Sequence, residues 1–465
     1  MTTPALPLPA TERPLGVADW LEAAFDEPRD QNAIVVATLQ APVAPLESLL
    51  DADPNAEAVV WHPADGPAFA ALGAVETLVG SGPDRMAQIR EQARVLLGRV
   101  VTRSPELGAP SPRCFGGFAF QAGWAREEPW SEFGDARFVF PRFTYARTRD
   151  AAFLSVALRS DEAASESRRR PFFDLAEALV GVLRSAAARG PHRAPAGPRT
   201  ITSRVEATEA EFRALVEETR SRIERGDFQK VVVAGRTALS FAEPVDVTDV
   251  LSELAVGDSS TRFAFRFGKV TFLGATPERL IRVSGLDVDT EALAGSGDAS
   301  RAAELFASVK ERNEHEFVIR EIVEHLAPLC SRLDFSNTPE VRTLRHLLHL
   351  RTPVRGKLAE RRHVLELVSR LHPTSAVGGL PGPEAVRFIT EHEPAERGWY
   401  AAPIGWFDRS GDGEFVVGLR SGAFAGNRAY LYAGGCVVRG SDPASEYAET
   451  RLKLRTLSTA LHVAK

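Results

Sequence analysis

The chain has 465 residues, of which 44% are hydrophobic, so it can bury a large core, and its length alone suggests two or three domains. The net charge of −6 and the lack of long Lys or Arg runs argue against a nucleic-acid-binding protein. The chain has no apolar run of about 18 residues, so no membrane span is predicted. The N-terminus lacks the apolar core of a signal peptide. The three widely spaced cysteines form no zinc or disulfide pattern, so we expect a soluble cytoplasmic protein.

The first part of the chain, residues 1–187, alternates short apolar stretches with turns. A segment rich in Pro, Gly and Arg follows, and its composition predicts a linker or surface loop at about 188–200. The remaining residues, 201–465, carry most of the candidate functional residues. The sequence therefore divides into an N-terminal portion, a linker and a catalytic portion.

A helix is predicted directly after the linker. Thr208 and Glu211 have the spacing of a capping box, apolar residues then recur at helical spacing, and Gly226 is a typical stop. Two further helical segments are predicted at 302–329 and 445–461.

Short strands are predicted between these helices, at 230–234, 263–267, 271–274, 402–407, 414–419 and 430–433. The second and third strands are separated only by Gly268 and Lys269, which predicts a tight hairpin, and the last three are spaced as an antiparallel meander. Helices and strands do not alternate strictly, so the pattern favours an α+β fold with a large mixed or antiparallel sheet.

Two pairs of glutamates have the same spacing, Glu311 with Glu314 and Glu446 with Glu449. Residues three apart lie on one face of a helix. Four carboxylates converging from two helices would bind a hard divalent cation, and Mg²⁺ is the natural occupant. Glutamates at this spacing are also common on solvent-exposed helix faces, and spacing alone leaves that alternative open.

Two single residues are candidates for acid–base chemistry. Glu278 follows a strand in the segment GATPE, where burial could raise the pKa of its carboxyl and make it a general acid. A glutamate at a helix start is the alternative. Lys230 begins an apolar strand and could act as a base if desolvated near a metal, or it could guard the edge of a sheet.

Candidate anion-binding groups occur near the ends of strands. Arg420 ends one strand, the backbone of Gly434 and Gly435 could meet a carboxylate, and Lys453 lies one helical turn after Glu449. Surface ion pairs are the alternative for the two cations. The Pro- and Gly-rich loop 371–381 could shape a pocket, although its histidine, His372, is more typical of a structural hydrogen-bonder.

The ordered motifs resemble the chorismate-utilising enzymes from about Val205 to the C-terminus. The resemblance rests on FQKVVVAGR, FLGATPERL, LAGS, SVKERNEHEFV, LHPTSAVGGLP, RGWYAAPIGWFD, GEFVVGLRSG and LYAGGCVVRGSDPASEYAETRLKL, and FGGFAF resembles the N-terminal portion. It implies one large α+β domain in which two mainly antiparallel sheets stack, flanked by helices. That expectation replaces the estimate of several domains.

The resemblance also implies residue roles. Four carboxylates would hold Mg²⁺, two as direct ligands and two assisting directly or through water: Glu314 and Glu449, and Glu311 and Glu446. Lys230 would be the base that activates water, and Glu278 the acid that protonates the departing C4 hydroxyl. Substrate contacts are implied for Ala294, Gly295, Ser296, His372, Thr374, Ala376, Tyr400, Leu419, Arg420, Gly434, Gly435 and Lys453.

Within the family, three features point to one reaction. Lys230 implies water rather than ammonia as the nucleophile, and hence no glutaminase subunit. Ala294 argues against a covalent amine route, and the LHPT loop against a salicylate synthase. The resemblance therefore implies a Mg²⁺-dependent isochorismate synthase acting on chorismate for menaquinone or siderophore biosynthesis, with the menaquinone type closer.

Two alternatives remain open at this point. One is a salicylate synthase, which also eliminates pyruvate. The other, of a different class, is a non-catalytic protein that binds chorismate or Mg²⁺. The presence of both Lys230 and Glu278 argues against the second alternative, since binding alone needs only the metal and carboxylate sites.

Overall fold

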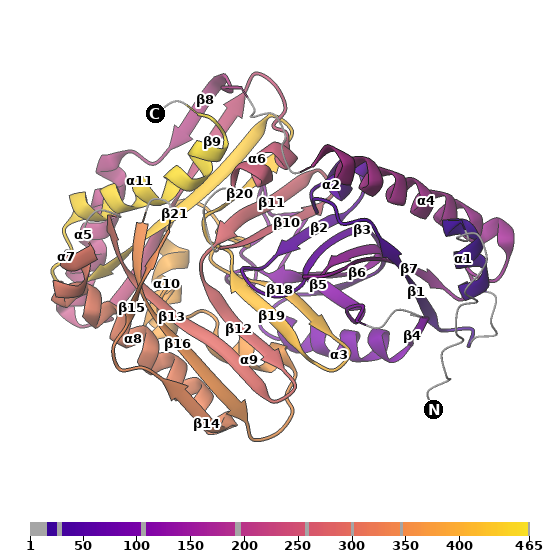
Figure 1. Ribbon diagram of the computed structural model, residues 1–465. Helices are drawn as coiled ribbons and strands as arrows, with labels where there is room; N and C mark the ends of the chain where they lie inside the picture. Colours follow the sequence, from indigo (N-terminus) through magenta and orange to yellow (C-terminus); the bar gives the residue numbers. More distant parts are fainter. Residues whose placement is uncertain are drawn as a thin grey trace.

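A branched network of β-strands dominates the computed structural model, which describes residues 16–25, 30–103, 108–190, 197–255, 260–298, 302–344 and 347–463 (Figure 1). The branch point is strand β6 (Ala136–Arg147), which pairs with β3 (Ala68–Gly80) along one edge. Its other edge pairs with β5 (Arg113–Phe118) and then with β7 (Ala152–Arg159). Two arms of sheet leave β6, so the predicted pair of stacked antiparallel sheets is present as one hydrogen-bonded network.

The first arm runs from β6 into the C-terminal part of the chain. Its strands follow in the order β3, β2 (Ala58–His62), β10 (Thr261–Phe267), β11 (Val270–Thr276), β20 (Ser421–Ala425), β21 (Arg428–Val438) and β9 (Lys230–Phe241). The far edge of β9 carries β8 (Ile201–Glu206) and β17 (Gly379–Leu380). Beyond β7 lie β1 (Ile34–Ala41) and β4 (Val100–Arg103), which pair in parallel.

The second arm begins at β5. It continues through β18 (Pro403–Asp408), β19 (Gly413–Val417), β12 (Arg279–Ser284), β13 (Asp287–Asp298) and β16 (Leu347–Leu358). Two strands, β14 (Cys330–Phe335) and β15 (Glu340–Thr343), share the far edge of β16. This arm contains several of the strands that bear candidate residues.

The predicted meander of the last strands is wrong in its pairing. β18 and β19 form a hairpin, and so do β20 and β21, but β19 pairs onward with β12 while β20 pairs with β11. The reason is local, because Arg420 lies between β19 and β20 in the left-handed region with φ of 50°. The chain turns there and passes from the second arm to the first. The hairpin predicted at Gly268 and Lys269 is confirmed, with Phe267 opposite Val270.

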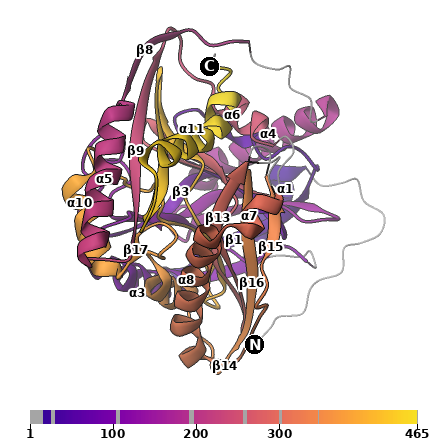
Figure 2. The same cartoon turned by 90° about the vertical axis from the view of Figure 1, so that its left-hand side faces the viewer.

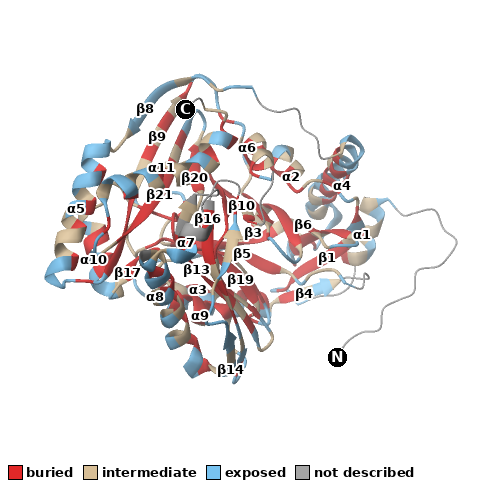
Figure 3. Ribbon diagram, turned by 60° about the vertical axis from the view of Figure 1, so that its left-hand side comes forward, coloured by how far each residue is buried: buried red, intermediate tan, exposed pale blue. Residues whose placement is uncertain are grey.

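Eleven helices are described, and they lie outside the strands (Figures 1 and 2). Their bounds are α1 Val17–Phe25, α2 Ser48–Ala52, α3 Arg85–Gly98, α4 Glu166–Arg189, α5 Glu209–Arg225, α6 Val247–Glu253, α7 Ala302–Ala307, α8 Val309–Leu326, α9 Val364–Leu371, α10 Gly382–His392 and α11 Pro443–Ala460. Figure 3 shows buried residues concentrated in the strands and exposed ones on the outer helices. Within the described part of the chain, no helix has the length and apolar character needed to cross a membrane.

The helix boundaries confirm the capping signals. Thr208 and Glu211 form both bonds of a capping box, and Gly226 ends α5 with φ of 89°. The predicted helix at 302–329 is divided, because Ser308 caps a new helix by accepting from the amide of Glu311. α4 continues to Arg189, into the predicted linker 188–200, of which residues 191–196 lie outside the described residues.

A buried ion pair ties α10 to the neighbouring strands. The side chains of Glu393 and Arg397 are 2% and 1% exposed, and Arg397 Nη2 lies 2.5 Å from Glu393 Oε1. Arg397 also donates to the carbonyls of Val232 and Val377, each at 2.8 Å. Glu393 accepts from the amide of Ala234 at 2.7 Å. The pair thus fixes β9 and the loop 371–381 relative to each other.

Removing one member of this pair should destabilise the fold. In Glu393→Ala the buried guanidinium of Arg397 loses its counter-charge, and the free energy of unfolding should fall by about 3–5 kcal/mol. The matched control is Glu217→Ala, which breaks a helical pair with Arg220 whose side chains are 54% and 33% exposed. Exposed pairs contribute at most about 1 kcal/mol, so equal losses in urea unfolding would contradict the assigned role.

Candidate active site

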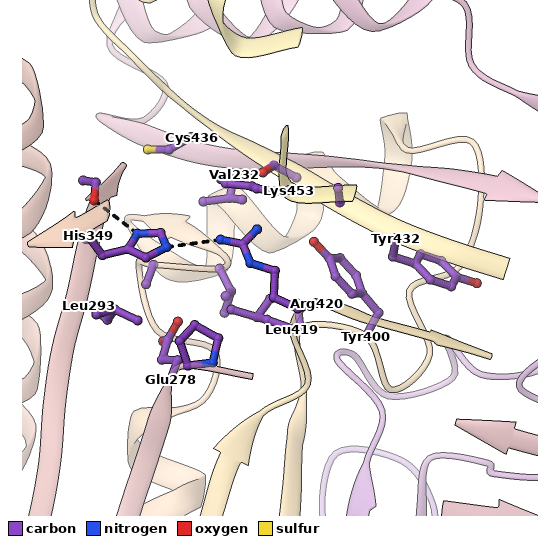
Figure 4. A pocket seen from close by; sticks show the side chains of 18 of the residues that line it. Val232, Glu278, Leu293, His349, Tyr400, Leu419, Arg420, Tyr432, Cys436 and Lys453 are labelled. Carbon is purple, nitrogen blue, oxygen red and sulfur yellow. Dashed lines mark hydrogen bonds between the residues drawn. The ribbon is translucent and has the colours of Figure 1, made fainter. Parts of the chain in front are cut away.

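A cleft lies where the chain passes twice between the two arms of the sheet. Pro277 and Glu278 join β11 of the first arm to β12 of the second, and residues 418–420 join β19 to β20. Figure 4 shows Glu278 and Arg420 directed toward the space between them. The cleft is narrow, and the space in it that the centre of a water molecule can occupy is about 70 Å³.

Most of the residues predicted to form the site line this cleft. They are Glu278, Ala294, Gly295, Glu314, Ala376, Tyr400, Leu419, Arg420, Gly434 and Lys453. Behind this lining lie Lys230, Glu311 and Glu449, which contact it, while Glu446 lies against Gly435, the chain neighbour of Gly434. The side chain of Ser296 lies outside the described residues.

Two predicted contacts are not brought to the cleft. His372 lines a separate cavity beside Arg85, where its Nε2 lies 3.0 Å from the carbonyl oxygen of Phe120. Burial lowers the pKa of His372 to about 3, so the ring is neutral and donates to that carbonyl. Thr374 is buried, and its carbonyl accepts from the amides of Val377 and Gly378. Both residues shape the loop that presents Ala376 rather than contacting the cleft themselves.

Glu278 is a carboxyl buried between two strands, not one at a helix start. It is 6% exposed, and its own carbonyl accepts from the amide of Val417 at 3.1 Å. Burial, followed by the negative charge of Glu291, raises the pKa of Glu278 to about 8, against the opposing effect of nearby cations. At neutral pH the carboxyl therefore holds a proton that it can donate into the cleft.

Lys230 is an interior residue of the sheet. It pairs with Val438 of β21 on one side and Leu380 of β17 on the other, and it is fully buried, so the edge-strand alternative is wrong. Its Nζ lies 3.5 Å from Glu314 Oε1. Burial favours the neutral amine, but the charges of Cys436 and Glu314 outweigh it and raise the pKa of Lys230. In this arrangement the residue is an ammonium that must release a proton before it can act as a base.

Arg420 is held toward the cleft by a histidine that the sequence analysis did not single out. Its Nη2 donates to Nε2 of His349 at 3.1 Å, and the Nδ1 of His349 donates to the carbonyl of Gly295 at 3.2 Å (Figure 4). Burial and the charge of Arg420 lower the pKa of His349 to about 3. The imidazole is therefore neutral, with Nε2 free of a proton and able to accept from the guanidinium.

Lys453 forms the second cationic group of the cleft. Its Nζ donates to the carbonyl of Gly434 at 2.8 Å and pairs with Glu449 Oε1 at 2.7 Å. A side chain at Gly434 would begin 2.9 Å from the carbonyl oxygen of Val233, so glycine allows the close approach of β21 and β9. The amino group is thus placed by α11 and by the backbone of β21 together.

The four predicted metal-site glutamates border the cleft from α8 and α11. Glu314 lines it and is 8% exposed, while Glu446 is 1% exposed and lies beside Gly435. Glu311 lies beside Gly295, which has a φ of 75°. A Cβ atom at Gly295 would lie 3.4 Å from the Glu311 carboxylate, so glycine leaves room for this carboxylate. The donors are all carboxylate oxygens, which suits Mg²⁺. Among the described residues, no three His, Cys, Asp or Glu side chains are gathered as a ready-made metal cage.

Several lining residues were absent from the sequence analysis. They include Val232, His349, Arg397, Tyr432 and Cys436. His349 carried a detectable signal, since it is a polar residue within the apolar run LLHL that becomes β16. Tyr432 stacks on Tyr400 with ring centroids 5.2 Å apart, a contact between distant segments that sequence spacing does not reveal.

Comparisons with known proteins agree with the predicted family and fold. A model of the chorismate binding enzyme family matches residues 20–462. The chain is 34% identical to the salicylate biosynthesis isochorismate synthase of Pseudomonas aeruginosa, over 97% of this chain and 93% of that protein. It is 35% identical to isochorismate synthase MenF of Bacillus subtilis, over 76% of this chain and 75% of that protein.

A solved structure is similar over nearly the whole length. It is MenF, the menaquinone-specific isochorismate synthase from Escherichia coli, which superposes with a TM-score of 0.76 at 27% identity and covers 95% of this chain and 99% of that chain. At 95% coverage the match extends over both arms of the sheet. From the family match, the fold and the cleft together, the chain belongs to the chorismate binding enzyme family.

Proposed function

We propose that the chain is an isochorismate synthase, which adds water at C2 of chorismate as the C4 hydroxyl leaves. The observation that carries the proposal is the buried, protonated Glu278 in the same cleft as the Lys230–Glu314 pair. A purely binding protein has no need of an acid held in this state. Relatives at 34% and 35% identity carry the isochorismate synthase name, which supports the same reaction.

The cations of the cleft suit the substrate. Chorismate bears two carboxylates, and Arg420 and Lys453 are placed to receive a carboxylate group in a desolvated setting where ionic hydrogen bonds are strong. The flat ring would lie among Val232, Leu293 and Tyr400. Substrate binding would therefore fix the ring with its reacting carbons between the acid and the base.

The proton movements balance. Lys230, once neutral, takes a proton from water as its oxygen bonds to C2. Both ring double bonds shift by one position, from C1=C2 and C5=C6 to C1=C6 and C4=C5, the C4–O bond breaks, and Glu278 gives its proton to the departing hydroxyl, which leaves as water. One water enters and one leaves, so substrate and product have the same mass. Both groups then return to their starting protonation states by exchange with solvent.

Mg²⁺ is proposed as the cofactor of the cleft. The carboxylates of Glu314 and Glu449 would hold it, with Glu311 and Glu446 assisting directly or through water. Mg²⁺ is commonly bound by one or two protein carboxylates together with water and substrate oxygens, so a preformed cage of three side chains is not required. When bound, the ion supplies charge compensation for the ring carboxylate.

Water as the nucleophile removes the need for an ammonia-supplying subunit. We therefore propose that the chain acts without a glutaminase partner, in the cytoplasm, in menaquinone or siderophore biosynthesis. The three cysteines, Cys114, Cys330 and Cys436, are not joined in disulfides, which fits a reducing compartment.

Product analysis tests the proposed reaction directly. Purified protein incubated with chorismate and Mg²⁺ should yield a product of unchanged mass, without pyruvate, and EDTA should abolish it. Added ammonia should leave the product unchanged. Salicylate with pyruvate would instead indicate a salicylate synthase, and an aminated product would contradict water as the nucleophile.

Substitution of the acid should separate binding from turnover. Glu278→Gln keeps the shape of the side chain but cannot give up a proton, so kcat should fall by about 100-fold or more while chorismate still binds. In the unsubstituted enzyme, kcat should rise with pH as Lys230 becomes neutral, and the rise should stop at about pH 8, where Glu278 loses its proton. Unchanged kcat in the variant would remove Glu278 as the acid.

Substitution of the base has a matched control on the surface. Lys230→Met should abolish turnover, since it removes the amine that would take the proton from water, while chorismate binding measured by calorimetry persists. The control is Lys357→Met, in which the lysine side chain is 54% exposed and pairs with Asp287. Turnover that survives in Lys230→Met would exclude Lys230 as the base.

A further inference from the structure

The backbone of Glu278 is held by hydrogen bonds at both its amide and its carbonyl. β11 ends at Thr276, whose hydroxyl donates to the carbonyl of Val417 at 2.6 Å and accepts from the amide of Glu278 at 3.3 Å. The carbonyl of Glu278 accepts from the amide of Val417 at 3.1 Å. β19 thus fixes the residue itself, while the peptide groups on either side of it bond elsewhere.

Those flanking groups are bound by one largely buried ion pair, Arg342 with Glu291. Arg342 Nη1 donates to the carbonyl of Pro277 at 2.8 Å, and Glu291 Oε1 accepts from the amide of Arg279 at 3.3 Å. The same Arg342 nitrogen lies 3.0 Å from the same Glu291 oxygen. The pair therefore spans Glu278 from the residue before it to the residue after it.

The pair is itself anchored in the second arm. Glu291 lies on β13 and Arg342 on β15, which reach each other across β16. The Glu291 side chain is 5% exposed, and its second oxygen accepts from Arg351 Nε at 2.5 Å. Three strands thus supply the groups that hold this crossing of the chain.

Glu291 also acts on Glu278 through its charge. Four charged groups influence the Glu278 carboxyl: Glu291 from β13, Lys230 from β9, Arg420 from the β19–β20 crossing and Lys453 from α11. Of these only Glu291 is negative, and it favours the protonated carboxyl. Position and protonation of the acid therefore depend on the same side chain.

We infer that Glu291 and Arg342 are positioning residues, which together clamp the backbone on both sides of Glu278 and aim its carboxyl into the cleft. The role of Glu278 as an acid rests on the function proposed above. The clamp itself rests on the hydrogen bonds to the Pro277 carbonyl and the Arg279 amide.

The experiment compares variants in the full-length enzyme. Glu291→Gln removes the charge, Arg342→Met removes the donor to Pro277, and Arg342→Lys keeps a cationic nitrogen. The matched control is Asp289→Asn, on the same strand and face as Glu291 and likewise paired with two arginines, Arg282 and Arg355, both at 3.5 Å. In the described part of the chain, the ion pairs of Asp289 are with Arg282 and Arg355 and not with the residues flanking Glu278.

Two measurements are made on each variant. The first is kcat and KM for chorismate across pH. The second needs no activity: the protein is labelled with ¹³C at the glutamate side-chain carboxyl, and the resonance of Glu278 is identified by its loss in Glu278→Gln. Its chemical shift is then followed against pH without substrate.

The expected result is specific to a positioning role. Glu291→Gln should move the midpoint of the Glu278 titration, and with it the pH at which kcat stops rising, about one pH unit lower. Arg342→Met should lower kcat about tenfold with KM nearly unchanged, the loss that misplacement of a reacting group produces, and Arg342→Lys should recover part of it. Asp289→Asn should match the unsubstituted enzyme in both measurements.

The outcomes separate the clamp from the proposed function. An unchanged Glu278 titration in Glu291→Gln, or losses in Asp289→Asn equal to those in Glu291→Gln, would overturn the clamp while leaving the reaction intact. Absence of chorismate turnover in the unsubstituted enzyme would overturn the reaction, and the carboxyl titration would still decide whether Glu291 governs Glu278.

Discussion

The site depends on the chain passing between the two arms of the sheet. Glu278 lies on one passage and Arg420 on another, and each interrupts the strand ladder for only a few residues. Side chains at such interruptions can point into the space between the arms, whereas those within a ladder alternate between its two faces. The backbone at these points needs partners from outside the ladder, and the neighbouring strands supply them.

Burial and the neighbouring charges together set the protonation states of the cleft residues. The charges oppose the effect of burial on the pKa at some residues and add to it at others. At Glu278 the effect of burial on the pKa exceeds that of the nearby cations, and the carboxyl is protonated at neutral pH. At Lys230 the effect of nearby negative charge on the pKa exceeds that of burial, and the amine is charged. At His349 burial and a cation act together, and the ring is neutral. One desolvated cleft therefore holds a proton donor, an ammonium and a neutral acceptor in defined states.

The sequence predicted those site residues whose signal is local. Lys230 in an apolar run and Glu278 directly after a strand stand out without any knowledge of the fold. Glu291, Arg342 and His349 act through strand pairing between segments about 50 residues or more apart, so their roles depend on register. Register is set by the whole sheet, and no spacing in the sequence encodes it.

The same limit explains the error in the last strands. Their spacing suits a meander, but the left-handed backbone at Arg420 sends β20 to the other arm. A non-glycine residue in this region costs of order 1–3 kcal/mol and persists where the surroundings hold it. Here His349 and the β11–β20 pairing hold it. The strained backbone puts Arg420 near Lys453. Burial and the charge of Arg420 disfavour the charged amine, but the charge of Glu449 and its hydrogen bond outweigh them and raise the pKa of Lys453. Two cations kept together in a desolvated cleft are best compensated by an anionic substrate. The left-handed backbone at Arg420, which made the predicted meander wrong, therefore also favours an anionic ligand.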